Sequence, residues 1–239
     1  MRRVPTGVKG LDEMLGGGLP RGRIILLCGG PGTGKTIFSL QFLVEAAKRG
    51  EPGVYVTLEE PLGFIREYAA AFGWDLRREE EDNLIRLLDL YIVSYGEGSL
   101  EVRRRETETP VLSVINAIIS AVREIKAQHI VVDPITSISI HEQNEGVRRL
   151  RIAEIFNRLR KTGCTSLITM ETSAPTRFYV EEFLADGIIR LEKSIHEFNL
   201  IKTVRIEKMR GLSYDEQPRR YTIDPKAGFT VYSTEPVRV

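Results

Sequence analysis

Short apolar runs alternate with longer segments of helical periodicity along the first three quarters of the chain. The runs are typical of buried strands, and they are 24–28, 53–58, 84–93, 129–133 and 164–170. Between them, apolar residues recur at helical spacing over 37–50, 61–73, 110–125 and 147–161. Strands that alternate with helices predict an α/β fold, a mostly parallel sheet with helices on both faces.

Both ends of the chain depart from this alternation. The first 22 residues are rich in glycine and proline, which predicts a turn-rich lead-in with a short helix near 11–15. From Gly187 onward the pattern favours antiparallel strands, over 188–193, 198–208, 219–223 and 229–232. The chain has 239 residues, which fits one domain over 1–239, with 187–239 as its β-rich C-terminal part.

Composition narrows the class of protein. Hydrophobic residues make up 42%, charged residues 28%, and the net charge is +1, so no overall field indicates nucleic acid or a membrane as partner. No apolar run approaches the roughly 20 residues that span a bilayer, and the N-terminus lacks the apolar core of a signal peptide. Cys28 and Cys164 lie inside apolar runs, as core residues in a reducing compartment do. We expect a cytoplasmic protein.

A glycine-rich loop lies between the first predicted strand and the first long helix. It matches the phosphate-binding pattern G-x-x-x-x-G-K-[ST] at every fixed position, and its residues are Gly29, Gly30, Pro31, Gly32, Thr33, Gly34, Lys35 and Thr36. Glycines let successive backbone N–H groups surround an anion, and the helix that begins near Ile37 adds its positive end. Lys35 is placed for the β- and γ-phosphates and the Thr36 hydroxyl for Mg²⁺. The sequence predicts a nucleoside triphosphate with magnesium.

Acidic residues follow three other predicted strands. They are Glu59 and Glu60, Asp133, and Glu171. Ligands of parallel sheets bind beyond the carboxyl ends of the strands, so these carboxylates are expected around the same triphosphate. Asp133 follows a β-branched run, as the aspartate that helps to hold Mg²⁺ does, although it could instead cap the turn before Pro134. One of the paired glutamates could activate the attacking water, or both could belong to a solvated turn.

Seven segments together resemble the KaiC-like branch of the RecA/RadA ATPase superfamily. They are residues 4–12, 17–22, 29–36, 58–60, 130–133, 180–183 and 208–211. The resemblance implies a RecA-like P-loop fold and a ring of six subunits, with ATP held between neighbours. It assigns the catalytic carboxylates to Glu59 and Glu60. It also implies that Lys208 and Arg210 reach the γ-phosphate of ATP bound to the adjacent subunit.

The same resemblance places Phe183, and less firmly Tyr214, beside the nucleotide across the subunit interface. Phe183 could equally be a core residue of an apolar helix. The leading hypothesis is therefore a slow Mg²⁺-dependent ATPase, which converts ATP to ADP and phosphate and acts as a homo-oligomeric ring. Autokinase activity is not expected, because the chain has no convincing equivalent of the Ser-Thr pair that double-domain clock proteins phosphorylate.

Two alternatives remain open at the level of sequence. A RecA/RadA-like paralogue would use ATP to bind single-stranded DNA through basic segments such as 103–105 and 148–161, but these contain few aromatic residues for stacking. A regulatory sensor would bind nucleotide without turnover, and would not need Glu59, Glu60, Lys208 and Arg210 together. His129, His141 and His196 are scattered and do not suggest a metal site.

Overall fold

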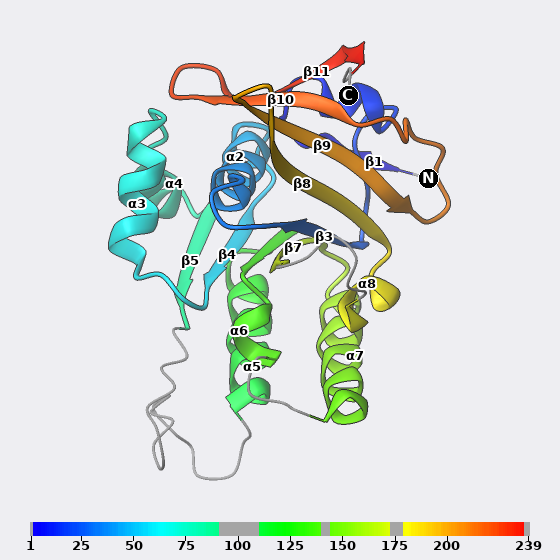
Figure 1. The fold of residues 1–239 in the computed structure, drawn as a ribbon. Helices are drawn as coiled ribbons and strands as arrows, with labels where there is room; N and C mark the ends of the chain where they lie inside the picture. Colours follow the sequence, from blue (N-terminus) through cyan, green and yellow to red (C-terminus); the bar gives the residue numbers. More distant parts are fainter. Residues whose placement is uncertain (1, 91–109, 140–143, 173–178, 237–239) are drawn as a thin grey trace.

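A nine-stranded sheet forms the centre of the molecule in the computed structural model, which describes residues 2–90, 110–139, 144–172 and 179–236 (Figure 1). Its strand order is β5-β4-β6-β7-β3-β8-β9-β10-β11. The pairs from β5 to β8 are parallel, and those from β8 to β11 are antiparallel. The parallel strands are β3 (Ile24–Gly29), β4 (Gly53–Thr57), β5 (Ile85–Asp89), β6 (His129–Asp133), β7 (Thr165–Glu171) and β8 (Gly187–His196). The remaining strands are β9 (Asn199–Met209), β10 (Arg219–Asp224) and β11 (Gly228–Pro236).

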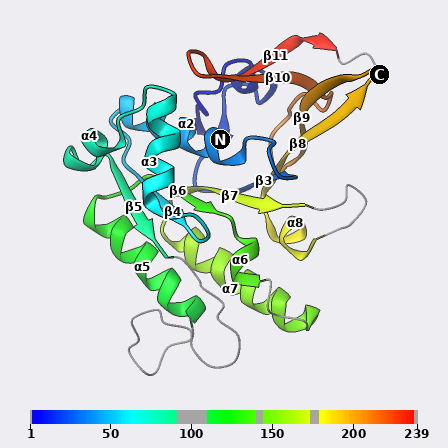
Figure 2. The same cartoon turned by 60° about the vertical axis from the view of Figure 1, so that its left-hand side comes forward.

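Helices cover both faces of the parallel part of the sheet (Figure 2). On one face lie α2 (Lys35–Lys48), α3 (Leu62–Ala71) and α4 (Leu76–Glu81), and on the other lie α5 (Pro110–Glu124), α6 (Thr136–Ser139), α7 (Glu145–Lys161) and α8 (Val180–Leu184). Alternate residues of β3 enter the two cores: Ile25 and Leu27 pack on the α2 side, and Leu26 and Cys28 on the α5 side. A strand buried on both faces must be apolar throughout, which is why β3 is a continuous hydrophobic run.

The fold class expected from the pattern is confirmed, with a parallel sheet that becomes antiparallel toward the C-terminus. Three pieces of structure were not predicted: α4, α6, and the pairing of β1 (Arg3–Val4) with β2 (Leu19–Pro20). Each is too short for a hydrophobic period to be recognised. The strand expected over 84–93 corresponds to β5, which ends at Asp89 within the described residues. Residues 91–109, including Arg103–Arg105, and His141 lie outside the described part.

The turn-rich lead-in packs against the last strands of the chain. Its short helix α1 (Leu11–Met14) follows Lys9, whose carbonyl accepts a hydrogen bond from Val231 of β11 at 2.8 Å. Gln41 of α2 joins the two ends: its Nε2 donates to the carbonyls of Gly7 and Phe229, and its Oε1 accepts from the Phe229 N–H at 2.6 Å. Residues far apart in the sequence thus meet over α2. In the described part of the chain, no helix has the length and apolar character needed to cross a bilayer.

Candidate functional site

The glycine-rich loop connects the end of β3 to the start of α2. Gly32 and Gly34 have φ angles of 71° and 94°, a left-handed conformation that glycine adopts without strain. A Cβ on Gly34 would lie 2.2 Å from the Ile223 Cδ1 atom of β10, so a larger residue would have to displace that side chain as well as adopt the left-handed conformation. β10 also holds the loop directly, because the Tyr221 hydroxyl donates to the Thr33 carbonyl at 2.7 Å. The C-terminal strands therefore help to shape the loop.

Lys35 is buried at the first position of α2. Its Nζ donates to the carbonyls of Gly29 and Gly30 at 2.9 and 3.0 Å, and lies 3.9 Å from Glu171 Oε1. Burial lowers the pKa of Lys35, and the nearby carboxylates of Glu171 and Asp133 oppose that shift. The Lys35 ammonium group is thus held by two carbonyl groups at the start of the glycine-rich loop, and it lies near the last residue of β7.

Asp133 ends β6 and points toward the loop. Its Oδ2 accepts hydrogen bonds from Thr36 Oγ1 at 2.9 Å and from the Tyr55 hydroxyl at 2.6 Å, and its Oδ1 accepts one from Thr169. Burial raises the pKa of Tyr55 well above its usual range, so this phenol stays protonated and donates. These bonds come from α2, β4 and β7, and so Asp133 is oriented toward the loop rather than acting as a cap for its own turn.

The paired glutamates lie beyond β4 and are held in different ways. Thr57 Oγ1 accepts from the Glu60 N–H at 3.1 Å and donates to the Glu60 carbonyl at 2.6 Å, which fixes the turn. Glu59 is exposed, and its Oε1 accepts from the Ser137 hydroxyl at 2.5 Å. Glu60 Oε2 is buried and has no hydrogen-bond partner among the described residues. A buried carboxylate oxygen in that state is costly unless a ligand or water contacts it.

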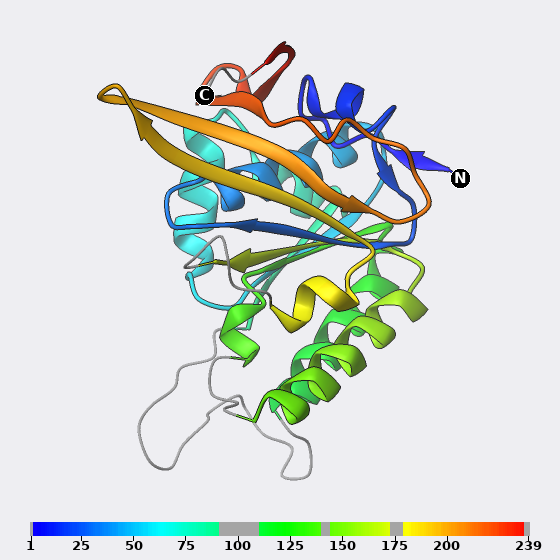
Figure 3. The ribbon, with the colours of Figure 1, turned by 45° about the vertical axis from the view of Figure 1, so that its right-hand side comes forward.

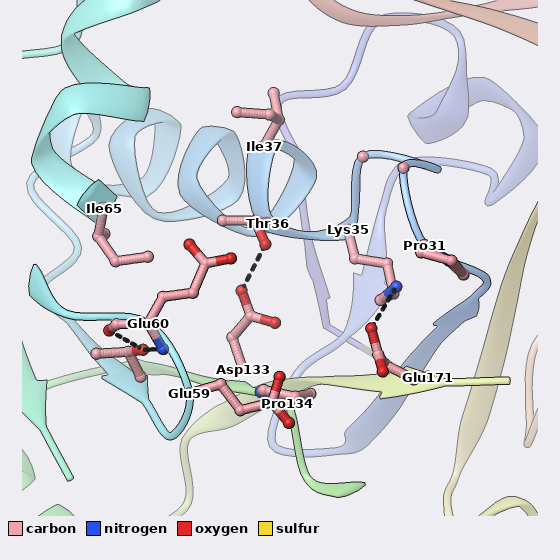
Figure 4. A pocket seen from close by; sticks show the side chains of 13 residues that line it. Pro31, Lys35, Thr36, Ile37, Glu59, Glu60, Ile65, Asp133, Pro134 and Glu171 are labelled. Atoms are coloured by element: carbon pink, nitrogen blue, oxygen red, sulfur yellow. Dashed lines mark hydrogen bonds and ion pairs between the residues drawn. The ribbon is translucent and has the colours of Figure 1, made fainter. Parts of the chain in front are cut away.

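These elements enclose one pocket at the carboxyl ends of the parallel strands (Figure 4). Its lining residues are Pro31, Gly32, Gly34, Lys35, Thr36, Ile37, Thr57, Glu59, Glu60, Ile65, Asp133, Pro134 and Glu171. Most residues predicted for the nucleotide therefore line a single cavity. Gly29, Gly30 and Thr33 lie directly behind it: the two glycine carbonyls accept from Lys35, and Thr33 Oγ1 donates to the Gly30 carbonyl. The lining carries four carboxylates and one ammonium group.

Three predicted residues lie outside this pocket, at the opposite edge of the sheet. Lys208 Nζ donates to the Glu182 carbonyl at 2.8 Å, and Arg210 Nη2 donates to the Phe183 carbonyl at 3.1 Å. Burial, followed by the charge of Arg210, lowers the pKa of Lys208. Phe183 is 55% exposed in α8, so the alternative that it is a core residue is wrong.

Arg210 lies near the amino end of β3, whereas the phosphate-binding loop follows its carboxyl end. Its Nη1 is 4.0 Å from Asp186 Oδ1, and Asp186 Oδ2 accepts a hydrogen bond from the Ile24 N–H, the first residue of β3. From Ile24 to Gly29, at roughly 3.3 Å per residue, the strand spans about 16 Å. Arg210 is therefore separated from the pocket of its own chain by the length of a strand.

Sequence reasoning did not find several residues that hold the site together: Tyr55, Ser137, Thr169 and Tyr221. Tyr55 lies between two valines of β4, and this hydroxyl inside a buried strand is a signal that could have indicated it. Thr169 is one of several polar residues in β7 and carries no such signal. Tyr221 bonds to a residue 188 positions away, and Ser137 lies in a four-residue helix, so neither carries a local signal.

The basic helix α7 uses several of its arginines in ion pairs. Arg148 contacts Glu181 at 2.7 Å, Arg158 contacts Glu154 at 2.9 Å, and Arg160 contacts Asp186 at 3.3 Å. These pairs favour the interpretation of α7 as a charged surface helix over that of a DNA-binding stripe. Among the described residues, no three His, Cys, Asp or Glu side chains gather as metal ligands.

Comparison with known proteins gives a consistent result. The family model described as "ATPase: KaiC" matches residues 4–236. A UPF0273 protein of Pyrococcus furiosus is 38% identical over 236 residues, which cover 97% of this chain and 94% of that protein. The circadian clock oscillator protein KaiC of Parasynechococcus marenigrum is 34% identical over 223 residues, but these cover 90% of this chain and only 42% of that protein.

A solved structure extends the likeness to three dimensions. The crystal structure of a KaiC-like protein from the hyperthermophilic archaeon Pyrococcus horikoshii matches with a TM-score of 0.82 and 34% identity, and covers 97% of this chain and 99% of the other. With a family model that spans nearly the whole sequence and a fold shared end to end, the chain belongs to the KaiC family of P-loop ATPases.

Proposed function

We propose that the protein hydrolyses ATP to ADP and phosphate in a Mg²⁺-dependent reaction, at a site that a second copy of the chain completes. The observation that carries the proposal is the single pocket in which Lys35, Asp133 and Glu60 meet at the carboxyl ends of three strands. The loop and Lys35 would bind the phosphates, and Ile37 lines the same pocket.

The donor set fits magnesium. Thr36 Oγ1 and Asp133 Oδ2 are hard oxygen atoms 2.9 Å apart, and Mg²⁺ is commonly bound by one or two protein oxygens together with substrate phosphates and waters. Thr36 and Asp133 would hold the ion, which when bound neutralises phosphate charge and polarises the bond to the leaving group. Tyr55 and Thr169 keep the Asp133 carboxylate in position for that role.

Glu59 and Glu60 are proposed as the carboxylates that act on the attacking water. Glu60 Oε2 is buried and has no partner among the described residues, so it can accept a proton from a water in the pocket. Ser137 holds Glu59, and Thr57 fixes the backbone between the two glutamates. The proton taken from water would pass to a carboxylate as the water oxygen attacks the γ-phosphorus. The bond from that phosphorus to the β–γ bridging oxygen would break, so that ADP leaves with the electron pair and phosphate is formed.

The charge of the pocket supports a contribution from a neighbouring copy. Four carboxylates and one ammonium group line it, and a triphosphate adds further negative charge. Magnesium offsets part of this charge. Lys208 and Arg210 could supply the rest, but in their own chain they lie a strand's length away. We therefore propose that they act across an interface, in a head-to-tail ring of six copies as the KaiC-like resemblance implies, with the exposed Phe183 and the half-buried Tyr214 beside them.

Complementation between two inactive variants tests this proposal. Glu59→Gln with Glu60→Gln removes the carboxylates but keeps Lys208 and Arg210, whereas Arg210→Ala does the reverse. Each variant alone should bind nucleotide, and Arg210→Ala should lose about 10³-fold or more in turnover. In an equal mixture, about one quarter of head-to-tail interfaces join an intact pocket to an intact arginine, so activity should return to roughly that fraction of wild type.

A matched control uses Lys35→Ala in place of Arg210→Ala. Mixed with the double glutamine variant, it offers no interface with an intact pocket, and the mixture should stay inactive. Full turnover in the double glutamine variant would remove the catalytic assignment of the glutamates. Full turnover in Arg210→Ala, or no recovery in an equal mixture that assembles, would exclude action across the interface.

A further inference from the structure

The β8–β9 hairpin ends in a two-residue turn with an unusual sequence. His196 pairs with Asn199 and Ile195 with Leu200, which leaves Glu197 and Phe198 as the turn. Their φ angles are 48° and 65°, so both are left-handed, and Asn199 Nδ2 donates to the Glu197 carbonyl. Such turns favour asparagine and glycine, and a bulky side chain in this conformation costs stability. Phe198 is therefore not explained by the turn itself.

The tip of this hairpin stands away from the body of the molecule (Figure 3), and three of its apolar side chains are exposed. Phe198 is fully exposed, Ile195 is 76% exposed, and Leu200, directly across from Ile195, is 59% exposed. Every residue from 193 to 200 is exposed. A strained aromatic residue surrounded by water, beside two other exposed apolar residues, indicates a contact surface.

The direction of the hairpin relates this tip to the nucleotide pocket. β8 runs parallel to β3, with Leu191 paired to Gly29, and then continues to His196. The tip therefore projects past the edge of the sheet that carries the phosphate-binding loop. Lys193 approaches that loop, since its Nζ would lie 3.3 Å from a Cβ on Gly32. At its other end, the same β9 strand carries Lys208.

We propose that the hairpin tip, defined as Ile195, Phe198 and Leu200, docks on a second copy of the chain, at the edge that presents Phe183, Lys208 and Arg210. This inference rests on the proposed function, in which that edge faces the pocket. Three side chains are too few for a stable interface alone, because specific interfaces bury about 1,200–2,000 Å². The tip would therefore add to a larger contact, in which the pocket edge of one copy faces the Phe183 edge of the next. The exposed Phe183 of that second copy offers an apolar surface for the tip.

The variant Phe198→Gly separates this role from a structural one. Glycine removes the backbone strain of the left-handed conformation at this position, so the thermal unfolding temperature of the monomer should stay the same or rise. Assembly in Mg²⁺ and a non-hydrolysable ATP analogue, followed by static light scattering, should need at least tenfold more protein. Leu150→Ser is the matched control: Leu150 is 73% exposed on α7, and its loss should leave assembly unchanged.

A cross-linking experiment locates the receiving surface. Cys28 and Cys164 are buried, so Phe198→Cys provides a single accessible thiol for a photoreactive maleimide. Cross-linked pairs should join position 198 of one copy to peptides that contain residues 180–184 or 208–214 of another. Cross-links to a different face would overturn the proposed docking surface.

The outcomes distinguish this inference from the proposed function. If wild type assembles and Phe198→Gly assembles at the same protein concentration, the hairpin tip does not dock on a second copy, and the proposed ATPase ring is unaffected. If wild type remains monomeric at every protein concentration, both the docking and the interface-dependent reaction are excluded. Weaker assembly of Phe198→Gly with a lowered unfolding temperature would also overturn the inference, because it would indicate a structural role for the side chain.

Discussion

The ammonium group of Lys35 has a carboxylate neighbour that a phosphate would have to replace or share. Glu171 is the last residue of β7, pairs in register with Gly29, and its Oε1 lies 3.9 Å from Lys35 Nζ. Because Glu171 and the phosphates of a nucleotide attract the same cation and repel each other, Glu171 should oppose nucleotide binding. Half of its side chain is exposed, so water screens part of this effect.

We predict that Glu171→Gln binds Mg²⁺–ADP more tightly, by about threefold to tenfold, where tenfold corresponds to roughly 1.4 kcal/mol. The glutamine keeps the shape of the side chain and removes its charge. Isothermal titration calorimetry at fixed ionic strength measures the dissociation constant. Glu81→Gln, on the exposed end of α4, is the control and should bind as wild type does. Weaker binding by Glu171→Gln would mean that Glu171 supports Lys35 rather than competing for it.

At the scale of elements, α2 is held at its centre as well as at its ends. Gln41 makes three hydrogen bonds that join this helix to the lead-in and to β11. All three are made by one nearly buried side chain, and its partners at Phe229 are buried with it. Since α2 begins at Lys35, the position of this lysine depends on contacts with both ends of the chain.

We expect Gln41→Met to destabilise the protein by about 2–4 kcal/mol. The methionine fills a similar volume but leaves the Phe229 N–H and two carbonyl groups without their partner, and unsatisfied buried groups cost about 1–3 kcal/mol each. Chemical denaturation followed by circular dichroism measures the free energy of unfolding. Ser39→Ala on the same helix is the control, because Ser39 Oγ is buried without a hydrogen-bond partner among the described residues and its removal should be neutral or stabilising. An equal decrease in the free energy of unfolding in both variants would mean that α2 tolerates substitutions poorly in general, and that the hydrogen bonds of Gln41 have no special importance.

Most of the parallel strands could be predicted from the sequence, but two of the short helices could not. Apolar runs predicted β3, β4, β6 and β7 because buried parallel strands must be apolar on both faces, and the rule of strand ends predicted that Glu60, Asp133 and Glu171 would meet. Helices α4 and α6 were not predicted, since six and four residues do not complete a recognisable hydrophobic period. The bond from Tyr221 to the loop depends on tertiary structure alone. The catalytic and interface roles of the site residues stay predictions.

At the scale of the whole molecule, the proposal assigns a role to two opposite edges of the sheet. The pocket lies at the carboxyl ends of the parallel strands, and Lys208 and Arg210 lie near the amino end of β3. If both edges are needed for turnover, an isolated chain has a pocket without the Lys208 and Arg210 of a neighbour, and so it has no complete site. Dilution then lowers activity by separating the subunits, without any change in the pocket itself.

The turnover of ATP per subunit should therefore rise with protein concentration and level off as assembly completes. Light scattering and phosphate release measured on the same samples test this, with and without single-stranded DNA. Two concentration curves that coincide and ignore DNA support the ring. Turnover that is constant over the whole concentration range would exclude a shared site, and strong stimulation by DNA would favour the recombinase-like alternative.

The separation of the pocket from Arg210 by the length of β3 has a consequence for communication between subunits. If each site combines the pocket of one subunit with the arginine of the next, every subunit shares its pocket with one neighbour and places its arginine in the pocket of the other. In the proposed ring, the loss of a phosphate from one pocket would first affect the subunit whose Arg210 lies there, because that subunit would lose an anionic partner. The neighbour on the other side would have no group in that pocket. Information about the nucleotide state would thus pass around the assembly in one direction only.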